Sequence, residues 1–189
     1  MWMVWWSVLS VRGSGTVLVD GQPVAAQDSN RLNQLVRSGA RCVVPDGVEI
    51  DLILGDLMVL GVVRDSEVTI PAPPAGGESL LVATVERGEL LVKTGPGFPG
   101  RTLHLVTTEG LTELVGTTVA VNKGEGFTCV CVLEGQARIG KDPAHFDEVP
   151  AGMRKVMFAG EKDPVIIPIE PAHEKDLVDF ATRNRDAFK

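Results

Sequence analysis

Residues 116–140 read GTTVAVNKGEGFTCVCVLEGQARIG, and this stretch decides the fold class. Apolar residues alternate with polar ones up to a glycine-containing turn at 122–126, and a strand-like run resumes after it. Period-two patterning bounded by glycine turns is typical of β-hairpins. We therefore predict two strands joined by a turn, and a third strand that starts at Gln136 after Glu134-Gly135.

The strand predicted over 127–133 is apolar on both faces. Val130 and Val132 fall on one face, whereas Cys129, Cys131 and Leu133 fall on the other. Strands with this pattern are usually central and covered on both sides. We expect both valines to be almost fully buried. The two cysteines are interpreted as reduced core residues, with a redox or zinc role as the alternative.

Short apolar runs separated by turn residues recur along most of the chain. Turn signals every 8–12 residues or so, about the spacing seen here, are typical of sandwiches and barrels. Hairpins are predicted around Asp20-Gly21, Asp46-Gly47 and Arg87-Gly88, and one helical turn within 26–39. The predicted fold class is all-β, as an antiparallel β-sandwich or β-roll with one C-terminal α-helix.

The C-terminal tail has a different pattern. Leu177, Phe180 and Phe188 lie on one side of a helical wheel, with charged residues elsewhere. This predicts an amphipathic helix of about four turns. The predicted organisation is a β domain over 1–170 and a helix over 171–189, packed on that domain or on a partner protein.

Several glycine turns and neighbouring strands occur in a characteristic order. They lie at residues 15–21, 45–52, 86–92, 116–117, 128–135 and 151–152. Together they resemble the FecR-type domain over about residues 10–155. The resemblance implies a β domain that relays ligand occupancy of an outer-membrane receptor to a sigma factor.

Length and composition indicate a single packed domain, and the net charge argues against nucleic-acid binding. The chain has 189 residues, which suits one domain, and a hydrophobic share of 44%, which is ample for a packed core. Its 25 acidic and 18 basic residues give a net charge of −7. Such a surface repels nucleic-acid backbones, so we expect no nucleic-acid partner.

The sequence contains no recognisable catalytic or metal-binding motif. Its histidines are His104, His145 and His173. None has a spacing typical of a metal site or of a nucleophile–base pair. Asp46, Asp51 and Asp56 are interpreted as turn and surface residues. We predict no catalytic residue, no cofactor-binding residue, no cofactor and no metal ligand, and therefore a protein that is not an enzyme.

Both ends of the chain carry large apolar side chains. The candidate interface residues are Trp2, Trp5, Trp6, Leu177, Phe180 and Phe188. Termini usually fray unless something holds them, and tryptophan is favoured at binding hot spots and at membrane–water boundaries. Closure of the domain's own core is the alternative. We predict that at least one end contacts a protein partner; the tryptophan cluster also suits a position near a membrane surface.

The predicted function is a non-catalytic FecR-like binding or assembly module. It would be an accessory or scaffold subunit of a membrane-associated or signalling complex. The alternative is a small-molecule or carbohydrate-binding β-barrel, which an apolar cavity lined by convergent polar groups would favour. The N-terminal run lacks the features of a signal peptide. The expected location is extracytoplasmic (periplasmic) from the resemblance, or cytoplasmic if the start shown is the true start.

Overall fold

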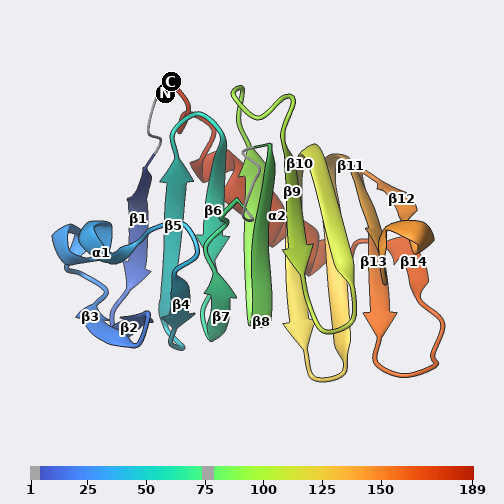
Figure 1. Ribbon diagram of the computed structural model, residues 1–189, viewed down its shortest axis with the longest axis horizontal. Helices are drawn as coiled ribbons and strands as arrows, with labels where there is room; N and C mark the ends of the chain where they lie inside the picture. The colour runs from blue at the N-terminus through green and yellow to red at the C-terminus, as the bar shows by residue number, and fades with distance from the viewer. Residues whose placement is uncertain (1–4, 74–78) are drawn as a thin grey trace.

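The computed structural model describes residues 5–73 and 79–189, which form two layers of strands and two α-helices (Figure 1). Three long strands bend and belong to both layers: β8 (Leu80–Thr94), β10 (Leu111–Gly124) and β11 (Phe127–Gly140). The helix-side layer also contains β1 (Trp6–Gly13), β5 (Val48–Leu54), β6 (Met58–Val62), β13 (Met153–Phe158) and β14 (Val165–Pro168). The opposite layer also contains β2 (Thr16–Val19), β3 (Gln22–Ala25), β4 (Arg41–Val44), β7 (Ser66–Thr69), β9 (Thr102–Val106) and β12 (Asp147–Pro150).

Strand pairing is almost entirely antiparallel. The helix-side layer runs β1-β5-β6-β8-β10-β11-β13-β14, with every pair antiparallel. The opposite layer runs β3-β2-β4-β7-β8-β9-β10-β11-β12, in which β8 and β9 are parallel. The predicted all-β class with a C-terminal helix is confirmed, and the strands pair mostly antiparallel. The parallel pair β8–β9 departs from the antiparallel fold that was predicted.

Glycines with positive φ mark bends in the long strands as well as turns. The hairpin predicted around Arg87-Gly88 and the strand end predicted at Glu134-Gly135 are both wrong. Gly88 (φ 80°) and Gly135 (φ 71°) lie inside the continuous strands β8 and β11. A left-handed glycine serves a bend or bulge as readily as a turn, so the local sequence does not separate the two cases.

Two other predicted hairpins had opposite outcomes. The hairpin at Asp20-Gly21 is confirmed, because both residues have positive φ and join the paired strands β2 and β3. The hairpin at Asp46-Gly47 is wrong. There β4 pairs with β2 and β7, whereas β5 pairs with β1 and β6. This turn therefore connects the two layers.

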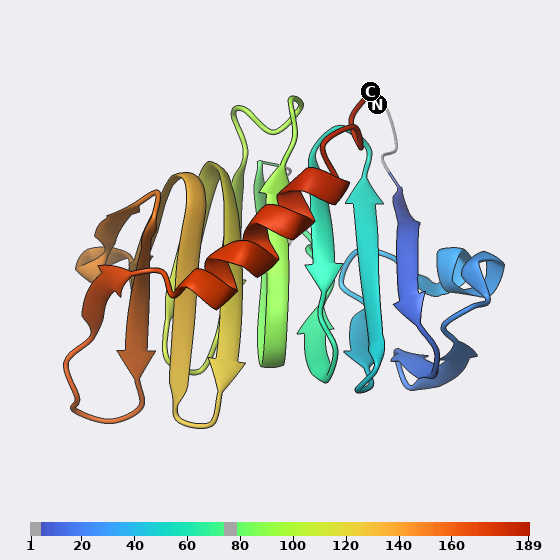
Figure 2. The same ribbon diagram turned by 180° about the vertical axis from the view of Figure 1, so that it is seen from behind.

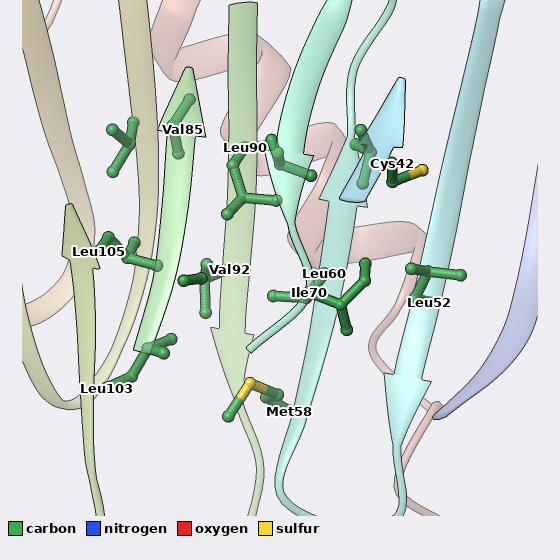
Figure 3. Packing of buried hydrophobic residues seen from close by; sticks show 14 of the residues in the cluster. Cys42, Leu52, Met58, Leu60, Ile70, Val85, Leu90, Val92, Leu103 and Leu105 are labelled. Atoms are coloured by element: carbon green, nitrogen blue, oxygen red, sulfur yellow. The ribbon is translucent and has the colours of Figure 1, made fainter. Parts of the chain in front are cut away.

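The main core lies between the layers and is formed by side chains from both (Figure 3). Val130 and Val132 of β11 are fully buried in it, as predicted. Cys129 and Cys131 point to the other side of β11 and belong to a second apolar cluster beneath the C-terminal helix. The central strand predicted from residues 127–133 is thus covered on both faces.

The two α-helices occupy different places. Helix α1 (Ser29–Leu35) begins after Asp28, whose side chain accepts a hydrogen bond from the Arg31 amide at 3.0 Å. Helix α2 (Pro171–Arg183) crosses the outer face of the helix-side layer (Figure 2). A short 3-10 helix, η1 (Pro143–His145), precedes β12. Among the described residues, no helix is long and apolar enough to cross a bilayer.

Candidate interaction surface

Helix α2 is held on the sheet by a buried apolar stripe. Leu177 and Phe180, one turn apart on the helix, have no exposed surface and pack over Val59 and Leu91. Gly61 of β6 permits this close approach. A Cβ atom at position 61 would lie 3.0 Å from Cε2 of Phe180, closer than an unstrained contact. The ring therefore rests directly on the backbone of β6.

A buried carboxylate holds the other end of the helix. Asp51 of β5 is fully buried. Its Oδ2 accepts hydrogen bonds from Nε of Arg183 at 2.7 Å and from Nδ2 of Asn184 at 3.1 Å. Nη1 of Arg12 on β1 donates to the same oxygen at 3.2 Å. The network joins β1, β5 and the last turn of α2 at one point.

The surroundings of Asp51 favour its ionised form. Burial alone would raise the pKa of this carboxyl, but hydrogen bonds from Arg183 and Arg12 outweigh that effect and lower the pKa below its usual value. The interpretation of Asp51 as a turn or surface residue is therefore wrong, although Asp46 and Asp56 are indeed exposed. The signal that was missed is a single charge between Ile50 and Leu52 of an apolar strand.

The six candidate interface residues do not form one exposed patch. Trp6, Leu177 and Phe180 are buried within the chain, and Phe188 is partly buried in the cluster beneath α2. Trp2 lies outside the described residues. The burial of these side chains shows where they pack within one chain, and contact of either end with a partner stays a prediction.

Trp5 is the exception among the candidates that the structure describes. Its side chain is 68% exposed, whereas that of the next residue, Trp6, is 4% exposed. Neighbouring side chains of an extended chain point to opposite faces, so Trp6 enters the core and Trp5 stays outside. Leu9, the extra residue of a β-bulge in β1, is also exposed.

A hollow lies beside Leu9. Its volume is about 400 Å³. It is lined by Leu9 and Ser10 of β1, by Arg183 at the end of α2, and by Asn184, Asp186 and Ala187 after the helix. Strand β1 and the segment that follows α2 therefore meet around one depression. We call Trp5, Leu9 and this hollow the terminal surface.

The edges of the two layers are protected against pairing with another strand. Each of three edge strands contains a proline that lacks an amide donor: Pro23 in β3, Pro150 in β12 and Pro168 in β14. On the fourth edge, the Val8 amide of β1 donates to Oδ1 of Asn33 in α1 at 2.7 Å. A partner would therefore contact side chains rather than extend a sheet.

Two further hollows contain polar groups. One, of about 510 Å³, lies between the loops at 106–111, 141–143 and 158–160. The other lies beside α2, where burial raises the pKa of Glu89 and Asn122 donates to its carboxylate at 3.3 Å. Within the described ranges, no group of three or more His, Cys, Asp or Glu side chains is arranged to hold a metal ion.

Comparison with known proteins supports the fold but assigns no function. No family model and no curated protein sequence matches the chain. Two crystal structures of a putative anti-sigma factor from Parabacteroides distasonis ATCC 8503, at 2.50 and 1.65 Å resolution, are similar, each with a TM-score of 0.57. Sequence identity is 13%, and the match covers 69% of this chain and 60% of theirs. At this identity the similarity shows the fold alone.

Proposed function

We propose that this protein is a non-catalytic binding module with a FecR-like β-roll, and that it acts as an accessory or scaffold subunit of a signalling or membrane-associated complex. The terminal surface is the part that contacts the partner, which is a protein. Two lines of support come from the order of the FecR-like segments and from the fold shared with putative anti-sigma factors. Neither carries the proposal by itself.

The exposure of Trp5 carries the proposal. A tryptophan side chain buries on the order of 150–250 Å² when it is covered, and it is among the residues most favoured at interface hot spots. Trp5 is 68% exposed and Leu9, four residues along the chain, is 39% exposed, although the chain buries Trp6 almost completely. The hollow that Leu9 lines provides concave surface for a partner's side chain.

A second exposed apolar surface lies on the edge strand β14. Val165, Ile166 and Ile167 of the edge strand β14 are each partly exposed. Their side chains are smaller than tryptophan, and no hollow among those described is lined by them. The terminal surface is therefore the stronger candidate.

Photo-crosslinking in the cells that make the protein tests the proposal. A photoreactive amino acid is placed at position 5, at position 9, or at the control position Val115, which is 58% exposed on a different part of the chain. We expect one defined protein adduct from positions 5 and 9 and none from position 115. Adducts at position 115 alone, or the same adducts at all three positions, would refute the assignment.

Small-molecule binding is the second candidate function. The hollow of about 510 Å³ includes Glu109 and Lys141, and a pocket of this size suits a small ligand. However, the Glu109 carboxylate already accepts hydrogen bonds from Thr108 and Thr128 and pairs with Lys123 at 3.2 Å. A ligand would find few free polar groups there, which places this function second. Thermal-shift screening of a metabolite library tests it.

A further inference from the structure

Two thiols face each other beneath helix α2. Cys129 and Cys131 are two residues apart on β11, both are buried, and their Sγ atoms are 4.0 Å apart. An ion held linearly between two thiolates, with bonds as long as the roughly 2.3 Å of a zinc–thiolate bond, needs sulfurs about 4.6 Å apart. A small rotation of either side chain makes up the difference.

An arginine lies beside the pair with an unused donor. Arg154 of β13 stands directly opposite Cys131 in the sheet. Its Nη2 donates to Glu170 at 2.7 Å, but its buried Nε has no hydrogen-bond partner in the described part of the chain. A buried donor without a partner is costly and calls for an explanation. A negative charge on the neighbouring sulfurs would satisfy it.

We propose that Cys129 and Cys131 form a two-coordinate site for a soft monovalent cation, Cu(I). Binding replaces the two thiol protons, which are released, and forms two copper–sulfur bonds without a change of oxidation state. The bis-thiolate complex carries one negative charge, and the Nε–H of Arg154, which has no partner among the described residues, is available to donate a hydrogen bond to it. Thiolates are the ligands that Cu(I) prefers. Zinc sites need four ligands, and the described residues bring no third protein ligand to the pair.

Helix α2 covers the proposed copper site. Leu177 and Phe180 of α2 belong to the same apolar cluster as both cysteines. Copper therefore enters only when α2 moves away from the sheet, and the closed helix then keeps water and competing thiols out. This site is separate from the terminal surface, and it does not depend on the function proposed above.

A Cu(I) titration tests the proposal. The reduced protein is titrated with Cu(I) under anaerobic conditions, in competition with a colorimetric Cu(I) chelator. We expect one Cu(I) per chain in the wild type. The site should be lost in both Cys129→Ser and Cys131→Ser and retained in Cys42→Ser, in which a third buried cysteine is replaced. Arg154→Gln should weaken binding about tenfold, the lower end of the effect of losing a hydrogen-bond partner of a metal ligand, and Arg154→Lys should weaken it less.

X-ray absorption of the copper-loaded wild type gives a readout that does not depend on the folding of any variant. Two sulfur ligands at a single distance are expected. Three results would overturn the proposal: no retention of copper against the chelator, unchanged binding in the Cys129 and Cys131 variants, or a copper environment that contains nitrogen or oxygen ligands. Stoichiometric Zn(II) binding that the same two variants abolish would overturn the assignment to a linear monovalent site.

Discussion

Arg183 of α2 and Asp51 of β5 are 132 residues apart in the chain and form an ion pair, with Nε 2.7 Å from Oδ2. The carboxylate is fully buried, whereas the guanidinium is partly exposed at the end of the helix. This contact fixes the last turn of α2 on the helix-side layer, next to the exposed residues of β1. The position of the terminal surface therefore depends on it.

The first prediction concerns the charge of Asp51. Asp51→Asn keeps the shape of the side chain but leaves Arg183 and Arg12 without their common counterion. Because both guanidinium groups are partly exposed and can be hydrated, we expect a loss of about 1–3 kcal/mol in the free energy of unfolding, below the cost for a fully buried pair. Denaturant unfolding measures the change.

Asp46→Asn is the matched control, because Asp46 is exposed at a turn. It should change the free energy of unfolding by less than about 0.5 kcal/mol. Equal effects of the two substitutions would mean that the buried network adds nothing to stability.

The second prediction concerns pH. The folded protein lowers the pKa of Asp51 below the value of about 3.9 that an aspartate has in an unfolded chain. The stabilisation is therefore complete above about pH 4 and is lost as the pH falls through the folded-state pKa. The difference in unfolding free energy between wild type and Asp51→Asn should shrink below that pH. A difference that stays constant from neutral pH into strong acid would contradict this.

The third prediction concerns the central strand. Val130 has no exposed surface and lies in the core between the layers. In Val130→Asp, a buried carboxylate without a partner would cost several kcal/mol, enough to unfold the domain. Circular dichroism during heating should show no cooperative transition. A cooperative melt near the wild-type temperature would show that the strand tolerates charge and is not central.

The fourth prediction concerns the protection of Cys129 and Cys131 by helix α2. In the wild type, Cys129 and Cys131 should react slowly with a thiol reagent until denaturant is added, because Leu177 and Phe180 cover them. Phe180→Ala should speed their labelling about tenfold or more by favouring local opening of the helix. Cys42, which lies in the other core, should remain slow. Equal acceleration of all three cysteines would indicate global unfolding instead.

The sequence predicted the parts of this fold that depend on local pattern. Alternation over 127–133 was enough to predict a strand covered on both faces, and Asp20-Gly21 was enough to predict a hairpin. The local sequence did not predict the structure correctly at Gly88 and Gly135. A left-handed glycine in a bent strand has the same local sequence pattern as one in a turn. The three long strands belong to both layers because of contacts between distant parts of the chain, and no local sequence pattern predicts this.

The sequence predicted only part of the candidate surface. In an extended chain, the neighbouring side chains Trp5 and Trp6 point in opposite directions, but the sequence does not say which of them faces the core. The contact between Asp51 and Arg183 spans most of the chain, and no local spacing predicts it. A charged residue inside the apolar run of β5 was the one available indication of a buried ion pair.

The fifth prediction compares the two neighbouring tryptophans. Trp6→Ala removes a buried side chain and should lower the free energy of unfolding by about 3–5 kcal/mol. Trp5→Ala removes an exposed one and should change it by less than about 0.5 kcal/mol. Thermal melts of the two variants measure this contrast. Similar losses in both would mean that Trp5 belongs to the core.

Sedimentation of the Trp5→Ala variant, compared with that of the wild type, tests the proposed function most directly. Tagged chains are isolated under mild conditions from the cells that make the protein, and their masses are measured by sedimentation. We predict that the wild type and Val115→Ala sediment in an assembly heavier than the 20.2 kDa chain, and that folded Trp5→Ala sediments as the free chain. A Trp5→Ala variant that stays in the heavier assembly, or a wild type that sediments alone, would contradict the proposed contact.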